Sequence, residues 1–284
     1  MHTVLRSEKR EVIIDLDSPF VMIGEKINPT GRKKLAEALA NHDFEFIINI
    51  ARQQAVAGAN ILDVNVGAPG IDEITVLPEV ALMVAQALDL PLCLDSANRE
   101  ALAAALAVLP GKPLINSVNG EEASLNRILP VVKEYGAAVI GLTMDEDGIP
   151  ATAEHRLKLA GKILERAITL GIPAEDVIID PLVLSIGADS QAASVTLKTI
   201  ELVRQNLGVN INLGASNVSF GMPERHTLNQ TFLVLAIAAG ATCAITDPVK
   251  LSLTIRAAEL LRGRDDHGRC YLSSWRTLQA NYPV

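Results

Sequence analysis

The amino-acid sequence predicts an α/β protein folded as a single (β/α)8 TIM barrel. The first observation is a regular alternation of short apolar runs with amphipathic segments of helical periodicity, eight of each along the chain. The second is composition: 49% of residues are hydrophobic but only 3% are aromatic, as expected for parallel strands covered by helices. The third is length, because 284 residues without a linker suit one barrel domain.

The strands are short apolar runs, most of which end in a polar residue and a turn residue. We expect them at 20–27, 60–66, 91–95, 113–117, 137–144, 177–183, the start of 210–225, and 241–246. The seventh opens the stretch N-I-N-L-G-A-S-N-V-S-F-G-M-P-E-R, where Ile211 and Leu213 alternate with asparagines. Gly214 and Ala215 then leave little side-chain bulk, so a ligand could approach the backbone closely.

Helical segments alternate with these strands, and glycines mark several of their ends. We expect helices at 34–57, 78–88, 99–108, 121–135, 153–170, 191–207, 228–239 and 249–262. Gly58 and Gly171 end the first and fifth helices, and Pro130 is expected to kink the fourth. Within the single domain 1–284, residues 1–19 are predicted to form a flap or hairpin and 263–284 a polar tail.

Charge and cysteine content exclude several classes of protein. The net charge of −8 and the absence of a basic run argue against nucleic-acid binding. The polar start and the lack of an apolar run of ~18 residues predict neither a signal peptide nor a membrane span. Cys93, Cys243 and Cys270 are too few and too scattered for a disulfide framework, so a cytoplasmic location is expected.

The polar residues at the carboxyl ends of the strands are the candidate site, because reacting groups of such barrels lie there. They are Asn28, Asp63, Asn65, Asp95, Asn98, Asn116, Asn119, Asp180, Ser216, Asn217, Arg225 and Asp247. Any one of these aspartates or asparagines is at least as easily a helix cap. As a set, carboxylates and amides suit a ring with adjacent N–H, amino and carbonyl groups, such as a pterin.

Other chemistries fit the sequence less well. No serine or cysteine stands beside a histidine in a nucleophile arrangement. Cys93 and Cys243 have no nearby cysteine or histidine, so packing is favoured over zinc binding, and no metal site is predicted. Lys26 is better explained as a solvated or ion-paired lysine beside Glu25 than as a Schiff-base lysine.

Seven motifs in order resemble the methyltetrahydrofolate:corrinoid-protein methyltransferases and the folate domain of cobalamin-dependent methionine synthase. They are G-E-K-I-N at 24–28, L-D-V-N-V-G at 62–67, L-D-S-A-N at 94–98, I-N-S-V-N at 115–119, G-L-T-M at 141–144, I-D-P-L at 179–182 and S-N-V-S-F-G at 216–221. The resemblance implies a pterin-binding, dihydropteroate synthase-like barrel. Dihydropteroate synthases themselves are expected to carry a Lys/Arg pair at strand seven, where this chain has G-A-S-N at 214–217.

The resemblance also implies roles for individual residues. Asp95, Asn116 and Asp180 match positions that hydrogen-bond the pterin ring, and Asn217 matches the position beside the methyl-bearing nitrogen N5. Arg225 matches a family arginine that either steadies its loop or meets the folate. For the proton that N5 needs, we expect a solvent network held by Asp63, Asn65, Ser216 or Ser219.

The resemblance further implies a methyltransferase that works with methyltetrahydrofolate and with a corrinoid, or cobalamin, carried by a partner protein. The near match D-D-H-G-R-C at 265–270 lacks the glycine of a corrinoid-binding motif, so this chain is not expected to bind the corrinoid itself. A homodimer is expected by analogy, and the folate glutamate tail is expected near solvent. A non-catalytic pterin-binding module, and less readily a dihydropteroate synthase, remain as alternatives.

Overall fold

The computed structural model describes residues 1–281 and confirms the barrel. The parallel strands are Val21–Ile27 (β3), Ile61–Val64 (β4), Leu92–Asp95 (β5), Leu114–Asn119 (β6), Ala138–Leu142 (β7), Val177–Asp180 (β8), Asn210–Ile211 (β9) and Cys243–Thr246 (β10). Their order in the sheet is β10-β3-β4-β5-β6-β7-β8-β9. The N–H of Ile245 donates to the carbonyl of Leu213 at 2.9 Å, and this contact brings the two sheet edges together.

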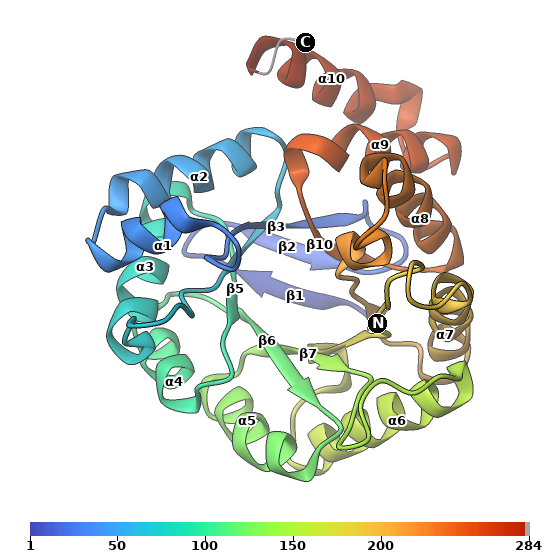
Figure 1. The fold of residues 1–284 in the computed structure, drawn as a ribbon, viewed down its shortest axis with the longest axis horizontal. Coiled ribbons are helices and arrows are strands. Elements are labelled where there is room, and N and C mark those ends of the chain that lie inside the picture. The colour runs from blue at the N-terminus through green and yellow to red at the C-terminus, as the bar shows by residue number, and fades with distance from the viewer. Residues whose placement is uncertain (282–284) are drawn as a thin grey trace.

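The helices follow the strands in alternation, and Figure 1 shows α1 to α9 as a ring around the sheet. Their bounds are Lys33–Ala40 (α1), Phe44–Val56 (α2), Glu73–Leu88 (α3), Arg99–Val108 (α4), Glu122–Tyr135 (α5), Ala153–Thr169 (α6), Ala192–Leu207 (α7), Arg225–Ala239 (α8), Pro248–Leu261 (α9) and Arg269–Asn281 (α10). Alanine, leucine, isoleucine and valine fill the layer between strands and helices, which explains the aromatic-poor composition.

An antiparallel hairpin closes the amino-terminal end of the barrel, as Figure 1 shows at its centre. It consists of β1 (Thr3–Arg6) and β2 (Glu11–Ile14), and its apolar side chains pack on inward-facing strand residues such as Ile23. The side-chain amide of Asn210 donates to the carbonyl of Ile14 at 2.6 Å. The structure has an antiparallel hairpin in the segment where a flap or hairpin is predicted, and the barrel's opposite mouth is the place for a site.

Two predicted helix boundaries were wrong. The segment 34–57 is two helices, because His42 adopts a left-handed φ of 52° and Asp43 accepts from Phe46 N at 3.2 Å to cap a new helix. The second helix begins at Glu73 rather than at residue 78, because Asp72 caps it and the helix runs through Pro78.

The predicted polar tail is also corrected, since α10 occupies most of it. Asp265 caps this helix by accepting from Cys270 N at 2.9 Å and Tyr271 N at 2.8 Å. Leu272 and Trp275 remain about half exposed, at 44% and 45%. Residues 282–284 of the predicted tail lie outside the described residues.

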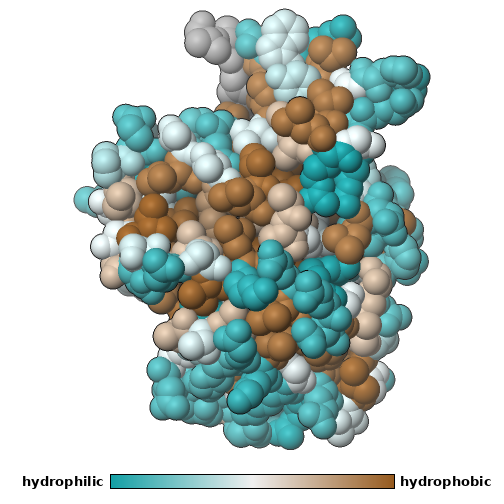
Figure 2. Space-filling model, turned by 90° about the vertical axis from the view of Figure 1, so that its right-hand side faces the viewer, coloured by the Kyte–Doolittle hydropathy of each residue, from teal (hydrophilic) through white to brown (hydrophobic). Residues whose placement is uncertain are grey.

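Figure 2 views the barrel from the side of α7 to α9, where brown apolar side chains lie among teal polar ones. The exposed apolar residues of α8 and α9 include Val234, Leu235 and Leu261, the last of which is 86% exposed. In the part of the chain that the structure describes, no helix combines the length and apolar character needed to cross a membrane.

Candidate active site

A cavity of about 430 Å³ lies at the carboxyl ends of the strands. It is lined by Glu25, Asn28, Thr30, Arg32, Asp63, Asp95, Asn116, Gly214, Ser216, Asn217, Arg225 and Ile245. These residues come from strands β3 to β6, from β10, and from the loops after β3 and β9. The sequence placed seven of them at strand ends, so most of the predicted set does converge on one space.

The carboxyl groups of Asp63 and Asp95 and the amide of Asn116, on three neighbouring strand ends, form the floor of this cavity. The side chain of Asn65 donates to Asp95 Oδ2 at 2.9 Å, and that of Asn116 donates to Asp63 Oδ1 at 3.3 Å. Asp95 and Asn116 are direct partners in the β5–β6 register, which brings their side chains to one face. Asn65 does not line the cavity itself but orients Asp95 from behind.

Burial makes the carboxyl groups of Asp63 and Asp95 weaker acids than those of free aspartates. Asp63 is only 2% exposed, and burial raises its pKa, with the charge of Asp95 raising it further. Burial also raises the pKa of Asp95, against the hydrogen bond from Asn65, which lowers it. The pair therefore retains a proton at pH values where free aspartates have lost theirs.

Because Asp63 and Asp95 are buried together, we predict that removing the charge of one of them stabilises the folded chain at high pH. The unfolded chain releases the Asp63 proton near pH 4, whereas the folded chain releases it at higher pH, so folding weakens as pH rises between these values. We expect Asp63→Asn to raise the free energy of unfolding by about 1–3 kcal/mol at pH 8 and by much less at pH 4. Thermal melts without ligand at both pH values test this, with the exposed Asp147→Asn as control. Equal shifts at both pH values would contradict it.

Asp180, predicted to contact the pterin ring, lies outside the residues that line the cavity. It is buried, its Oδ2 accepts from Asn212 at 2.8 Å, and its Oδ1 accepts from Leu182 N at 2.8 Å. Burial raises its pKa to about 6. The fully buried Arg156 donates to the carbonyls of Pro181 and Leu182 at 3.0 and 2.9 Å and holds the same loop. A direct contact between Asp180 and a ligand stays a prediction.

The loop after β9 presents Asn217 to the cavity as part of a 3-10 turn, Ala215–Ser219. Arg225 steadies this loop, because it donates to the carbonyl of Ser216 at 2.9 Å and to Ser219 Oγ at 3.1 Å. The side-chain amide of Asn217 makes no hydrogen bond to any other residue in 1–281. A free amide on a braced loop is available to a ligand.

Ser219, one of the expected water-holding residues, is fully buried and occupied by Arg225. Ser216 lines the cavity and lies near enough to the carboxyl group of Glu25 to lower its pKa slightly, against the larger effect of burial. Any proton network on this side therefore passes through Ser216 and Glu25 more directly than through Ser219.

Glu25 was missed as a site residue, because it was considered only as a neighbour of Lys26. It lines the cavity together with Ser216 of the Asn217 loop, and burial raises its pKa, while the positive charges of Lys26 and Arg32 lower it. The available signal was its place in β3, one residue after Gly24, where a polar residue follows the apolar run of the strand.

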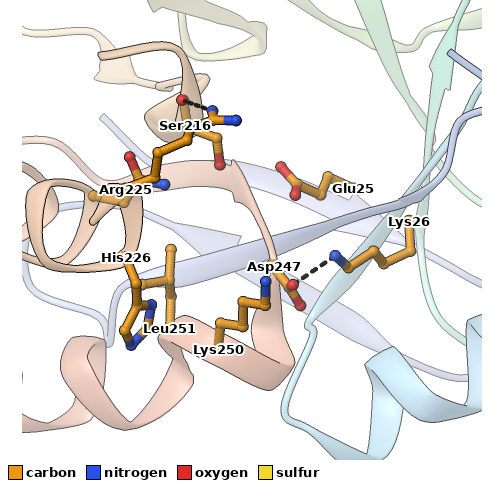
Figure 3. Close-up of a pocket in the computed structure, with 9 residues that line it drawn as sticks. Glu25, Lys26, Ser216, Arg225, His226, Asp247, Lys250 and Leu251 are labelled. Carbon is orange, nitrogen blue, oxygen red and sulfur yellow. Dashed lines mark hydrogen bonds and ion pairs between the residues drawn. The ribbon is translucent and has the colours of Figure 1, made fainter. Parts of the chain in front are cut away.

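Three members of the predicted strand-end set serve the fold instead. Asn98 caps α4, and Asn119 accepts from Glu121 N at 3.0 Å before α5. Asp247 caps α9 and pairs with Lys26 at 2.5 Å, as Figure 3 shows. Lys26 is thus ion-paired, but with Asp247 rather than with the adjacent Glu25.

Within residues 1–281, no three histidine, cysteine, aspartate or glutamate side chains lie together as a metal site would need. Cys93 and Cys243 are buried in the barrel interior, where burial raises the pKa of each thiol above its usual range. They pack as small apolar residues.

Comparison with known proteins agrees with this geometry. The model of the pterin-binding enzyme family matches residues 24–247. The chain is 31% identical over 265 residues to the methylcorrinoid:tetrahydrofolate methyltransferase of Eubacterium limosum, covering 90% of this chain and 96% of that protein. It is 32% identical over 248 residues to methionine synthase of Mycobacterium tuberculosis, covering 83% of this chain but 21% of that protein.

Among solved structures, dihydropteroate synthase of Xanthomonas albilineans superposes with a TM-score of 0.68 at 20% identity, over 93% of this chain and 98% of that one. The Yersinia pestis dihydropteroate synthase gives a TM-score of 0.69 at 17% identity, over 93% and 100%. These likenesses show the shared barrel fold. The family match and the Eubacterium relative go further: this chain is a pterin-binding enzyme and belongs to the methyltetrahydrofolate:corrinoid-protein methyltransferase family.

Proposed function

We propose that this enzyme moves a methyl group between N5 of methyltetrahydrofolate and the cobalt of a corrinoid carried by a separate protein. The observation that carries the proposal is the unpartnered amide of Asn217, which faces the same cavity as the carboxyl pair Asp63 and Asp95. Recognition of a pterin edge needs only the floor residues Asp63, Asp95 and Asn116. A free donor on the opposite wall suits a reacting nitrogen.

The hydrogen-bonding groups on the floor of the cavity complement the edge of a pterin ring, and the cavity volume is suited to a small molecule. A volume of about 430 Å³ lies in the ordinary range for small-molecule sites. The Asp95 carboxylate accepts from the ring N–H and exocyclic amine together, as it would from a guanidinium, and Asn116 reads a neighbouring donor or acceptor. Asp63, beneath them, holds the proton that keeps the pair from carrying two charges.

In the folate-to-corrinoid direction, the N5–CH3 bond breaks and its electron pair stays on N5, which takes up a proton. The reduced cobalt supplies the electron pair of the new cobalt–carbon bond, so the corrinoid is a second substrate. Asn217 donates a hydrogen bond to N5 that strengthens as charge builds there, and this differential stabilisation lowers the barrier.

An amide cannot give up its proton, so the proton comes from elsewhere. Glu25 lines the cavity together with Ser216 and has a pKa raised by burial, which favours its protonated form. We assign Glu25 as the group that holds this proton, with Ser216 passing it toward N5. In the reverse direction the same carboxylate receives the proton.

The Asp95 assignment predicts a binding defect. We expect Asp95→Asn to weaken methyltetrahydrofolate binding by about 1–3 kcal/mol, because an amide presents N–H groups to ring donors and loses the charge. Calorimetric titration measures the change, with the exposed Asp147→Asn as a matched control. Parent-like affinity of the Asp95 variant would place the pterin elsewhere.

A non-catalytic pterin-binding module is the second candidate, and the same cavity would serve it. Turnover separates the two. Purified enzyme, cob(I)alamin and methyltetrahydrofolate should convert the cob(I)alamin spectrum to that of methylcobalamin, slowly compared with a protein-bound acceptor. Folate binding without any enzyme-dependent spectral change would favour the module. A dihydropteroate synthase is disfavoured by Gly214 at the expected strand-seven cation.

The corrinoid is assigned to a partner because, within residues 1–281, the one stretch that resembles a corrinoid-binding motif has another role. The motif-like stretch 265–270 serves the fold, since Asp265 caps α10. Phe220, 71% exposed beside Asn217, gives the cavity rim an apolar contact for an arriving protein. Purified enzyme is expected to show no corrinoid absorbance. We further propose a homodimer, for which the exposed Leu235 and Leu261 on α8 and α9 offer apolar surface, and a cytoplasmic location, which rests on the few scattered cysteines.

A further inference from the structure

Arg156 of α6 is a buried cation whose hydrogen bonds all go to neutral oxygens. It is 1% exposed, and it forms no ion pair with a carboxylate within residues 1–281. Its Nε donates to the carbonyl of Pro150 at 2.8 Å. Its Nη1 donates to the carbonyls of Pro181 and Leu182 at 3.0 and 2.9 Å and to Thr196 Oγ1 at 3.2 Å. Burying a charge in this way costs free energy, so packing alone would be served better by an apolar side chain.

The carbonyls that Arg156 holds lie at the start of residues 182–187, which form the bracing loop. Leu182 has a left-handed φ of 56°, which is unfavourable for a branched side chain and persists only where the surroundings fix it. Its carbonyl also accepts from Thr196 Oγ1 at 2.8 Å, and its N–H donates to Asp180 Oδ1 at 2.8 Å. The direction in which the loop leaves β8 is therefore set by α6 and α7, which Figure 1 shows as neighbours in the ring.

The bracing loop hydrogen-bonds the turn that carries Asn217. The N–H of Ile186 donates to the carbonyl of Val218 at 2.9 Å, and Ser185 Oγ donates to the carbonyl of Phe220 at 2.5 Å. Val218 follows Asn217 directly in the chain, and the N–H of Phe220 donates to the Asn217 carbonyl at 3.1 Å. The loop after β8 thus holds the backbone immediately after Asn217.

Apolar packing and a close approach at Gly187 hold the bracing loop against the same turn. Val183 packs with Val218 in a small buried cluster. A Cβ on Gly187 would lie 3.2 Å from Met222 Sδ, which is closer than ordinary van der Waals contact. The absence of a side chain on Gly187 therefore lets the two loops meet.

We propose that the bracing loop, anchored by Arg156, positions Asn217 for methyl transfer. The inference rests on the proposed function. Arg225 holds the carbonyl of Ser216 before Asn217, and the bracing loop holds the carbonyls after it, so the free amide projects from a fixed backbone. Displacing a positioned group by about 1 Å can cost about a hundredfold in rate. Arg156 and Ser185 are therefore positioning residues that act through Asn217.

Ser185→Ala removes one link between the bracing loop and the turn at a partly exposed position. Methyl transfer from saturating 5-methyltetrahydrofolate to cob(I)alamin gives kcat, and calorimetric titration gives the folate Kd. We expect kcat to fall by about threefold to tenfold, which is what one neutral hydrogen bond is worth. The Kd should match that of the parent, because neither Ser185 nor its partner Phe220 lines the cavity. Ser194→Ala, an exposed serine of α7, is the matched control and should change neither value.

Arg156→Lys weakens the anchor, because a lysine ammonium lacks the planar fork that reaches several carbonyls. We expect kcat to fall by about tenfold to a hundredfold, with Arg166→Lys on the same helix as the matched control. If Arg156→Lys does not fold, Thr196→Val replaces it, since it removes only the hydroxyl that contacts Leu182. Each substitution is also made in Asn217→Ala, where it should cause no further loss, because the loop acts through that amide.

A merely structural role would give a different pattern. Parent-like kcat for Ser185→Ala would overturn the inference and leave the proposed function standing. Losses that multiply with that of Asn217→Ala would also overturn it, because the loop would then act through another group, such as Asp180. If the parent binds folate but transfers no methyl group, the proposed function fails and this inference fails with it.

Discussion

Replacing Asn217 with alanine should slow methyl transfer by about one to three orders of magnitude, which is what loss of one transition-state hydrogen bond costs. The amide is free within the described residues and faces the cavity, so its removal leaves no other bond broken. The exposed position on the loop after β9 should leave the barrel folded. Rates are measured with folate and corrinoid saturating, so that the loss appears in kcat.

Two observations separate this role from a general defect. Asn119→Ala, at the end of β6 and outside the cavity, is the matched control and should retain parent-like kcat. Binding of methyltetrahydrofolate to Asn217→Ala should weaken less than kcat falls, because the hydrogen bond is strongest in the transition state. Near-parent kcat for Asn217→Ala would remove its assigned role.

Glu25→Gln should slow transfer from folate to corrinoid by about a hundredfold and change the pH profile. Burial raises the pKa of Glu25, so its protonated form persists to higher pH than that of a free glutamate and is lost as pH rises through that pKa. The parent rate in this direction should therefore fall with rising pH. The glutamine variant can still donate a hydrogen bond but supplies no proton, so its low rate should lose this dependence.

The matched control for Glu25 is Glu37→Gln on the exposed face of α1, which should keep the parent rate and profile. In the corrinoid-to-folate direction Glu25 acts as the base, and the parent rate should instead rise with pH. A parent-like pH profile of Glu25→Gln in both directions would assign the proton to another group, with the pair Asp63 and Asp95 next in line.

Much of the fold could be predicted from the sequence because barrel strands and helices have strong local signals. Apolar runs ending in polar residues located every parallel strand, and the ends at Gly136, Gly208 and Gly240 have the left-handed φ that glycine allows. The break at His42 was missed because both halves share one helical periodicity. The helix α10 was missed because none of its residues is buried, so its sequence is not constrained by packing against the barrel core.

The site was harder to predict because the same residue types serve two purposes. Asn98 and Asp247 are caps, while Asp63 and Asn116 face a cavity, and only the direction of each side chain distinguishes them. Asn217 was predicted as a site residue from the family resemblance and from its position in the loop after the seventh strand. Glu25 was overlooked because Ser216, which lines the same cavity, is 191 residues away along the chain, and only closure of the barrel brings the two together.

The central claim is that a methyl group crosses between folate and a protein-bound corrinoid at the mouth of this barrel. The most direct measurement supplies 5-methyltetrahydrofolate labelled in its methyl group to the enzyme and a reduced corrinoid protein, then counts label on the isolated corrinoid protein. We predict one labelled methyl per cobalt, dependent on the enzyme and strongly slowed by Asn217→Ala. Label that remains entirely on folate with every reduced corrinoid acceptor, although the enzyme binds the folate, would contradict the account.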